Sequence, residues 1–248
     1  MIQRYKLLIE YDGTDYSGWQ KQPEERTVEG EIEKALSTLY QLEIDVIGQG
    51  RTDAGVHALE QVAHVDLPDT YNKRRILHAM RGLLPDDVTI FDLEKTHSEF
   101  HSRFDAISRK YIYRIANRPI PIDRHKIWYS FMNCDIVLLN KCANLILGEH
   151  DFHSFCIAND DPNLTTQCTI TESIWRREDD LLIYTITGNR FLRQMVRRLV
   201  GTMVQVSAGK IDMIKFEDML TQVKCTTPAY SAPPSGLTLV SVGYDDYQ

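Results

Sequence analysis

The sequence predicts an α+β fold of two ferredoxin-like (RRM-like) halves, each with the element order βαββαβ and a mainly antiparallel sheet. Two observations support this prediction. Strand-like and helix-like apolar periodicities follow one another in the same order twice along the 248 residues, without clear identity between the two copies. The second series begins after residues 104–108, which divides the chain into domains 1–105 and 106–248.

The first half contains two predicted helices. One covers residues 27–40 with Thr27 as its N-cap, and Pro85 closes the other over residues 72–84. Short apolar runs bounded by turn residues predict the strands. These strands cover residues 4–11, 44–47, 61–67 and 88–96.

The second half repeats the pattern. Gly148 ends a helix predicted over residues 136–147. Apolar residues at i, i+3, i+4, i+7, i+8 and i+11 from Leu192 predict a longer helix over residues 191–207. A short extra helix is predicted over residues 214–223. The strands cover residues 110–116, 169–177, 181–187 and 237–244.

The composition is that of an ordinary globular protein, 43% hydrophobic and 25% charged. No apolar run approaches the roughly 20 residues of a membrane span, and residues 1–10 are typical of a strand rather than a signal peptide. His150 and His153 have no further ligand nearby in sequence, so no metal site is predicted. The cysteines lack Cys-x-x-Cys spacing, which predicts reduced thiols in a cytoplasmic protein. They are Cys134, Cys142, Cys156, Cys168 and Cys225.

The net charge of −7 alone argues against a nucleic-acid-binding protein, but the basic residues are clustered. Between residues 100 and 126, seven basic side chains face only Asp105 and Asp123 in sequence: Arg103, Arg109, Lys110, Arg114, Arg118, Arg124 and Lys126. This clustering predicts a basic region that attracts a polyanion. Solvated strand and helix surfaces are the alternative.

A second basic cluster lies at the start of the long predicted helix. Arg190, Arg193 and Arg197 follow i, i+3, i+7 spacing, which would place them on one face of that helix. A helix N-terminus carries partial positive charge. The spacing therefore predicts a site for a carboxylate or a phosphate.

The most distinctive loop follows the predicted strand at residues 44–47. It contains Gly48, Gly50 and Gly55 around Arg51 and Asp53, and glycines at this density permit left-handed angles and close approach to a ligand. An accessible aspartate beside a cation is a candidate nucleophile. A simple hairpin turn is one alternative. A dinucleotide-binding turn is another, but Asp53 stands where that motif needs glycine or alanine.

The string Gly-Arg-Thr-Asp-Ala-Gly-Val-His-Ala at residues 50–58 resembles the signature of the TruA family of tRNA pseudouridine synthases. Further blocks resemble the family in the same order along essentially the whole chain. They lie at residues 11–14 with 18–20, 100–104, 109–113, 188–192 with 195–201, and 232–237.

The resemblance implies an isomerase that converts uridine to pseudouridine in the anticodon stem-loop of tRNA, at positions 38, 39 and 40. It implies an Asp nucleophile, no cofactor of any kind, and a cytoplasmic, RNA-binding homodimer. It also implies that the two sheets lie side by side with a cleft between the halves, the aspartate loop in the first half and the tyrosine and arginine motifs in the second.

By resemblance, Asp53 is the nucleophile, attacking either C1′ of the ribose or C6 of the uracil. Arg197 is the arginine that pairs with it, and Tyr111 stacks on the target base. Arg198 lies about 100° further around the helix and is the less suitable neighbour. The remaining candidate RNA contacts are Arg51, His101, Arg103, Phe104, Lys110, Arg190 and Arg193.

Three positions depart from the usual family pattern, and none belongs to the predicted catalytic set: Arg190, Cys168 and Thr238. Three other functions stay open. One is a related synthase with a different RNA target. Another is a catalytically silent RNA-binding module, although neither half carries an RNP1-like string. The third is a hydrolase using Asp53, which would need a second carboxylate.

Overall fold

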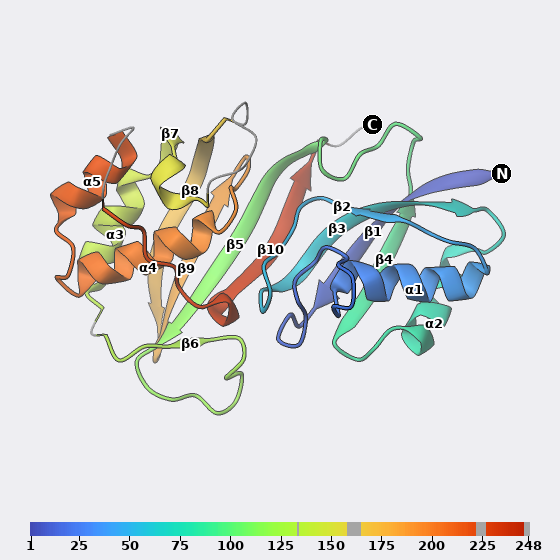
Figure 1. The fold of residues 1–248 in the computed structure, drawn as a ribbon, viewed down its shortest axis with the longest axis horizontal. Helices are drawn as coiled ribbons and strands as arrows, with labels where there is room; N and C mark the ends of the chain where they lie inside the picture. Colours follow the sequence, from blue (N-terminus) through green and yellow to red (C-terminus); the bar gives the residue numbers. More distant parts are fainter. Residues whose placement is uncertain (133, 158–164, 222–226, 246–248) are drawn as a thin grey trace. The chain divides into compact units, whose positions relative to one another are not determined.

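The computed structural model describes residues 1–132, 134–157, 165–221 and 227–245, and the chain divides into two compact units. Unit 1 contains Met1–Ile107 and the segment that begins at Thr238, and unit 2 is Ser108–Leu237. In each unit helices accompany a mostly antiparallel sheet (Figure 1). The fold class is therefore α+β, as predicted.

Unit 1 follows the predicted order βαββαβ. Its strands pair in the order β4-β1-β3, all antiparallel, and β2 is antiparallel to β3 on the opposite edge. The last strand of the chain, β10, pairs with that same edge of β3 in parallel, Thr238 opposite His57. The elements are β1 Ile2–Tyr11, α1 Val28–Tyr40, β2 Val46–Gly48, β3 His57–Pro68, α2 Lys73–Leu83, β4 Val88–Lys95 and β10 Leu237–Tyr244.

Local signals position both helices of unit 1. The side chain of Thr27 accepts a hydrogen bond from the backbone N–H of Gly30, and that of Asn72 accepts one from Arg75. Each bond satisfies one of the donors that a helix start leaves unpaired. Both helices lie on one face of the sheet (Figure 1), and α1 buries Ile32 and Leu36 completely.

Unit 2 has an antiparallel sheet in the order β5-β9-β8-β7, with β6 parallel to the end of β5. In its core, Trp175 stacks on Tyr184 with ring centroids 4.8 Å apart. The elements are β5 Ala106–Ala116, β6 Trp128–Tyr129, α3 Ile136–Leu145, β7 Gly148–Asp151, β8 Gln167–Glu178, β9 Leu181–Gly188, α4 Met195–Ser207 and α5 Met213–Thr221, with short 3-10 turns at His153–Phe155 and Pro234–Gly236.

The predicted start of α4 is wrong. The helix begins at Met195 rather than at residue 191, because Gln194 has a left-handed backbone (φ 61°) that a helix cannot continue through. The strands β6 and β7 were not predicted, since neither carries an alternating apolar pattern. The predicted end of the short helix, Val223, lies outside the described residues, as does Cys225.

The sequence assigned the last strand to domain 106–248, whereas its pairing with β3 groups it with unit 1.

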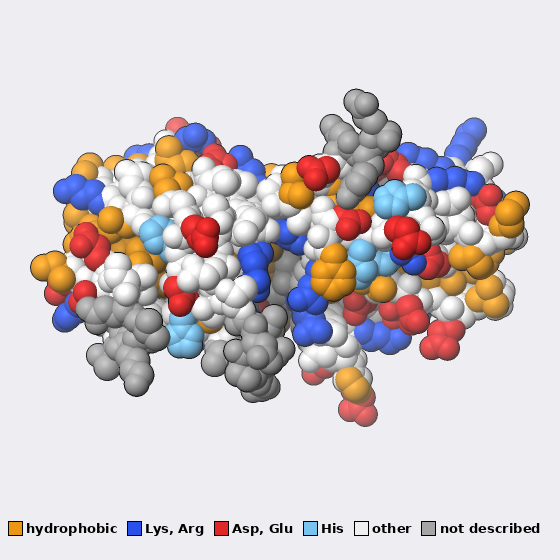
Figure 2. All heavy atoms as spheres, turned by 90° about the horizontal axis from the view of Figure 1, so that it is seen from above, with side chains coloured by type: hydrophobic (Ala, Val, Ile, Leu, Met, Phe, Trp, Pro, Cys, Tyr) orange, Lys and Arg blue, Asp and Glu red, His pale blue; other side chains and the backbone are white. Residues whose placement is uncertain are grey.

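The other cysteines, Cys134, Cys142, Cys156 and Cys168, are buried and free, and burial raises the pKa of Cys142 to about 12. Across the described ranges, no helix is long and apolar enough to cross a membrane. Basic and acidic side chains are interspersed over the face drawn in Figure 2.

Candidate active site

The candidate nucleophile lies on the loop that joins β2 to β3. Asp53 is half-buried, its neighbour Thr52 is buried, and Arg51 and Ala54 are exposed. The N–H of Val56 donates to the carbonyl of Asp53 over 3.2 Å, which closes a turn around the aspartate. The loop does connect two antiparallel strands, as the hairpin alternative requires, yet it leaves Asp53 partly accessible.

Residues 11–19, which we call the supporting segment, are hydrogen-bonded to this loop. The hydroxyl of Tyr11 lies 2.8 Å from Oγ1 of Thr52, and the N–H of Trp19 donates to the carbonyl of Thr52 over 3.1 Å. On the C-terminal side of Asp53, the N–H of Gly55 donates to the carbonyl of Tyr16 over 3.4 Å. The backbone of the loop is therefore tied down on both sides of Asp53.

Two glycines allow this close approach. A Cβ atom on Gly13 would lie 2.0 Å from the carbonyl oxygen of Val56, and one on Gly18 would lie 2.7 Å from that of Thr52. Gly18 also has a left-handed φ of 97°. In the loop itself the glycines differ, because only Gly55 has a positive φ, while a Cβ on Gly50 would meet nothing within 4 Å.

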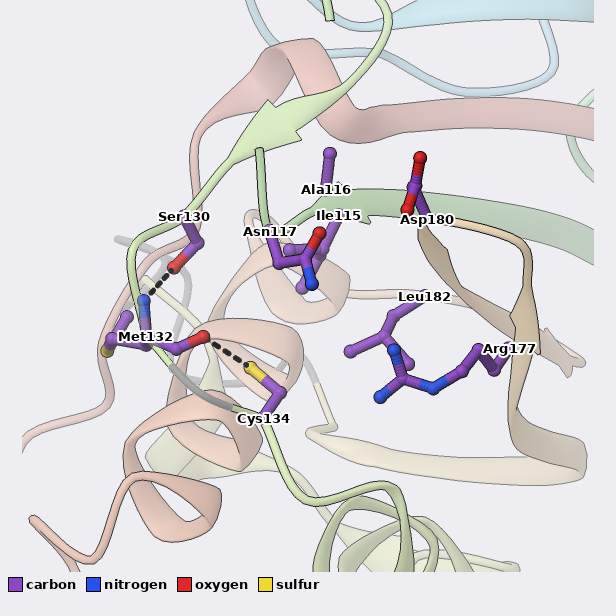
Figure 3. A pocket seen from close by; sticks show the side chains of 9 residues that line it. All are labelled: Ile115, Ala116, Asn117, Ser130, Met132, Cys134, Arg177, Asp180 and Leu182. Carbon is purple, nitrogen blue, oxygen red and sulfur yellow. Dashed lines mark hydrogen bonds between the residues drawn. The ribbon is translucent and has the colours of Figure 1, made fainter. Parts of the chain in front are cut away.

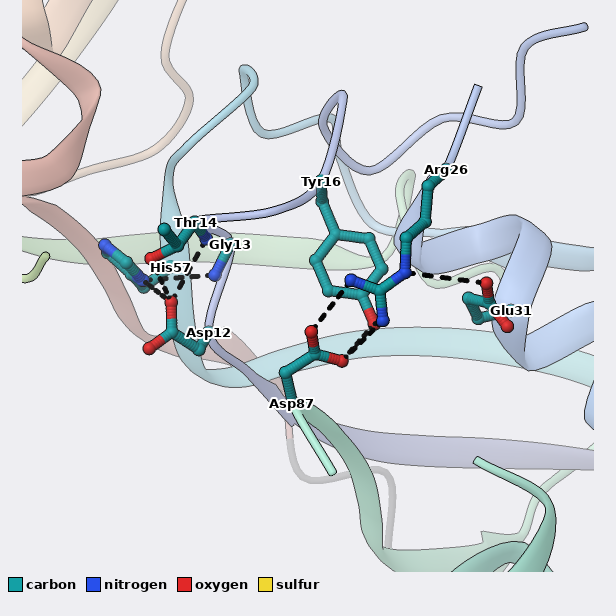
Figure 4. A network of polar contacts seen from close by, with 8 residues as sticks. All are labelled: Asp12, Gly13, Thr14, Tyr16, Arg26, Glu31, His57 and Asp87. Carbon is teal, nitrogen blue, oxygen red and sulfur yellow. Dashed lines mark hydrogen bonds and ion pairs between the residues drawn. The ribbon is translucent and has the colours of Figure 1, made fainter. Parts of the chain in front are cut away.

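A polar cluster that sequence reasoning missed anchors the supporting segment (Figure 4). Arg26 donates to both carboxylate oxygens of Asp87, over 2.8 and 2.9 Å, and the hydroxyl of Tyr16 donates to the same carboxylate over 2.6 Å. The guanidinium also lies 4.2 Å from the centroid of the Tyr16 ring. Because Tyr16 bonds the loop at Gly55, this cluster indirectly fixes the position of Asp53.

The cluster makes stability depend on pH. Burial raises the pKa of Asp87, but hydrogen bonds from Arg26 and Tyr16 outweigh it, so the pKa of Asp87 lies below its usual range. A lowered folded-state pKa stabilises the fold at neutral pH, and this stabilisation is lost as the pH falls below about 4. We expect Asp87→Asn to cost about 2 kcal/mol at pH 7.

Urea denaturation between pH 7 and pH 3 measures this difference. The gap between the wild type and Asp87→Asn should narrow as the pH falls, whereas Asp86→Asn, at an exposed neighbouring position, should stay within about 0.5 kcal/mol of the wild type at every pH. A gap that stays constant down to pH 3 would contradict the assigned ion pair.

A second set of contacts orders the beginning of the supporting segment. The N–H of Gly13 donates to Nδ1 of His57 over 3.1 Å, and Oδ1 of Asp12 lies 3.1 Å from the same nitrogen. Thr14 donates to that oxygen of Asp12 from its backbone N–H and its hydroxyl (Figure 4). The histidine of the signature string is 2% exposed, so it positions the segment rather than facing solvent.

In unit 2, Arg197 is held by the segment that precedes β10. Its Nε donates to the carbonyl of Ala232 over 2.9 Å, and the N–H of Ala232 donates to the carbonyl of Arg197 over 3.0 Å. Gly201 lets α4 approach this segment, since a Cβ there would lie 2.0 Å from the carbonyl oxygen of Tyr230. Arg198 points elsewhere and donates to the carbonyl of Cys156.

Tyr111 lies on β5 opposite Ile186 and is half-buried. Its ring meets that of Phe191 edge to face, with centroids 5.3 Å apart. Tyr113 lies two residues further along β5 and so faces the same side of the sheet as Tyr111. Its hydroxyl donates to the carbonyl of Pro233, which follows Ala232, the residue that accepts from Arg197. Within unit 2, the tyrosine and arginine motifs therefore belong to the same side of the sheet.

The predicted row of arginines on one helix face is wrong. Arg190 and Arg193 precede α4 and lie in irregular backbone, and only Arg197 is on the helix. Acids distant in sequence also neutralise part of the other basic cluster. Lys110 pairs with Glu172 over 3.0 Å, and Arg118 pairs with Asp180 over 2.7 Å.

The other candidate RNA contacts differ in exposure. Arg51, Arg103 and Phe104 are exposed, and His101 is half-buried. Among the residues with described side chains, no group of His, Cys, Asp or Glu could hold a metal ion.

A small hollow in unit 2 contains none of these residues (Figure 3). It lies at the end of β5, where Ile115 and Ala116 line it together with Arg177 and Cys134. Since a strand rises about 3.3 Å per residue, Tyr111 lies roughly 13 Å or more along β5 from this hollow. We therefore do not assign it to the candidate active site.

Comparison with known proteins agrees with the sequence resemblance. A sequence profile described as tRNA pseudouridine synthase matches residues 7–105 and 142–245. A protein of Dictyoglomus turgidum, named tRNA pseudouridine synthase A, is 40% identical over 249 residues, which cover 98% of this chain and 100% of that protein. Proteins of the same name from Dictyoglomus thermophilum (41% identical; 97% and 99% covered) and Bacteroides thetaiotaomicron (36% identical; 99% and 92% covered) are also similar.

Proposed function

Because the chain belongs to the TruA family of tRNA pseudouridine synthases, which are isomerases, we propose that it converts uridine to pseudouridine at positions 38, 39 and 40 of the tRNA anticodon stem-loop. The observation that carries the proposal is the half-buried Asp53 on a loop tied down on both sides, within a chain that matches the family over nearly its whole length.

The proposed reaction exchanges one bond to the ribose for another. In one route, the carboxylate of Asp53 attacks C1′ and the N1–C1′ bond breaks, leaving the uracil with the electron pair. The uracil then turns, C5 attacks C1′, and the carboxylate leaves. In the other route, the carboxylate first adds to C6 of the uracil. The N1–C1′ bond then breaks, C5 bonds to C1′, and loss of the proton on C5 expels the carboxylate from C6. In both, C5 loses a proton and N1 gains one, so the reaction needs no redox cofactor, metal or ATP.

Arg197 and Tyr111 complete the proposed catalytic set. Arg197 pairs with the carboxylate of Asp53, which would hold that carboxylate in one orientation. Its contact with Ala232 supports this role, because a fixed guanidinium loses less side-chain entropy when it binds. Tyr111 stacks on the target base, and the ring of Phe191 behind it supports that position.

The target uridine must leave its stack before any side chain can reach it, at a cost of a few kcal/mol. Phosphate contacts offset that cost and set the register. We assign these contacts to Arg51, Arg103, Lys110, Arg190 and Arg193, with His101 and Phe104 beside Arg103. We further propose that both halves of the chain are ferredoxin-like and that the protein acts as a cytoplasmic homodimer.

The test is to incubate the purified protein with unmodified tRNA transcript, without added cofactor and with a chelator present, and to map pseudouridine at single-nucleotide resolution. We expect product at positions 38 to 40 only, and none in a transcript with cytidine at those positions. Product at other positions would indicate a related synthase with a different target. RNA binding without any product would instead favour a silent RNA-binding module.

A further inference from the structure

A turn between β4 and β5 displays an aromatic side chain to solvent. Phe104 is 75% exposed, although burying a phenylalanine ring ordinarily stabilises a fold. One side of its ring is covered by His101, with centroids 4.2 Å apart and planes 40° apart. His101 in turn lies 4.8 Å from the buried ring of His64, so three rings form a series that leads from the interior to the surface.

This turn is rigid. Ser102 is fully buried, and its hydroxyl donates to the carbonyl of Ile47 over 2.7 Å. Its N–H donates to Nδ1 of His64 over 3.1 Å, and its carbonyl accepts from the hydroxyl of Tyr244 over 2.6 Å. Burial lowers the pKa of His64 to about 4, which keeps that ring neutral and able to accept this bond at neutral pH.

The turn also holds its own aromatic residues in place. The backbone N–H groups of Arg103 and Phe104 both lie within reach of Nδ1 of His101, at 3.2 and 3.4 Å. The N–H of His101 donates to Asp105, and the N–H of Asp105 donates to the carbonyl of His101. An exposed ring that the backbone holds in one position loses little entropy when a ligand packs on it.

We propose that Phe104, backed by His101, is a stacking platform for an unpaired nucleobase of the RNA substrate other than the target uridine. This proposal rests on the proposed function, because it takes the ligand to be the RNA substrate. The exposed guanidinium of Arg103 lies 5.8 Å from the centroid of the Phe104 ring. An open aromatic face beside a cation matches a base with its adjoining phosphate better than it matches an apolar protein surface.

The position of the turn supports a base near the site. Ser102 is bonded to Ile47, on the strand that leads directly into the loop carrying Asp53. Both the platform and the loop of the candidate nucleophile are therefore attached to β2, so an RNA strand bound to the platform has a defined register relative to Asp53.

The test compares the binding of unmodified tRNA by full-length Phe104→Leu and Phe104→Trp. Leucine keeps the site apolar but removes the π-face, and we expect affinity to fall about tenfold while the slope of log K against log [salt] stays unchanged. Tryptophan should keep the affinity, and its fluorescence should be quenched when tRNA binds. Arg103→Gln should instead reduce the salt slope by about 0.7, as expected for the loss of one phosphate contact.

Phe91→Leu is the matched control, because Phe91 lies on β4 of the same unit and is 44% exposed. It should bind tRNA as the wild type does. The stacking proposal would be overturned if Phe104→Leu bound tRNA with wild-type affinity and the fluorescence of Phe104→Trp were not quenched by tRNA. A change in the sedimentation of the RNA-free protein caused by Phe104→Leu would also overturn it, and would assign the ring to a contact between two copies of the chain.

The binding test of the Phe104 variants can fail or succeed independently of the proposed catalytic function. A wild-type protein that binds tRNA and forms no pseudouridine would refute the proposed function, while the Phe104 variants would still measure stacking through binding alone. A wild-type protein that binds no RNA would overturn both.

Discussion

Asp53→Asn is expected to abolish pseudouridine formation while leaving tRNA affinity within about tenfold of the wild type. The asparagine keeps the shape of the side chain but removes the charged nucleophile, and loss of a nucleophile costs at least about 10³-fold in rate. Phosphate contacts elsewhere supply most of the binding free energy, so affinity should change little. Single-turnover release of tritium from tRNA labelled at C5 of uridine, together with a filter-binding titration, measures both quantities.

Asp45→Asn is the control for this experiment, because Asp45 is exposed just before β2 and lies outside the loop. It should react at the wild-type rate. If Asp53→Asn retained more than a tenth of the wild-type rate, the nucleophile would have to be another residue. A large loss of affinity without Asp53 would contradict the separation of binding from chemistry.

Gly13→Ala is expected to lower kcat by about 10²-fold with a much smaller change in KM. The added Cβ would lie 2.0 Å from the carbonyl oxygen of Val56, so the backbone next to Asp53 must move by an ångström or more. A displacement of about 1 Å in a catalytic group is enough for a loss of this size. The crowding also costs about 1–3 kcal/mol of stability, which a thermal melt would detect.

The matched control for Gly13→Ala is Gly82→Ala. Gly82 lies in α2, and a Cβ there would meet nothing within 4 Å. Alanine is the better helix former, so this variant should be stabilised by about 0.5–1 kcal/mol with unchanged kcat. Equal activity in the two variants would mean that the position of the Asp53 loop does not depend on the close approach at Gly13.

Elements with local signals could be predicted from the sequence. The helices α1 and α2 begin where Thr27 and Asn72 cap them, and each cap bonds a backbone N–H only three residues away. The last strand was predicted over its observed bounds, Leu237–Tyr244. These signals act over a few residues, so the order of residues is enough to reveal them.

Elements that depend on a single backbone angle or on distant partners could not be predicted. The apolar stripe from Leu192 onward continues the helical period, yet the left-handed Gln194 delays the helix to Met195. This removes Arg190 and Arg193 from the helix. Likewise, the two residues of β6 carry no pattern of their own and form a strand only because β5 lies beside them.

The sequence by itself determined the Thr27 cap and the position of the candidate nucleophile on a glycine-rich loop, because each depends on a short run of residues. It also determined the class of the fold and the family, because periodicities and motif blocks recur in order along the chain. Only the tertiary structure decided what holds that loop. The pair of Arg26 with Asp87 joins residues 61 positions apart, and the contact of Tyr11 with Thr52 spans 41. Such contacts form when the strands and helices pack, so no local pattern records them.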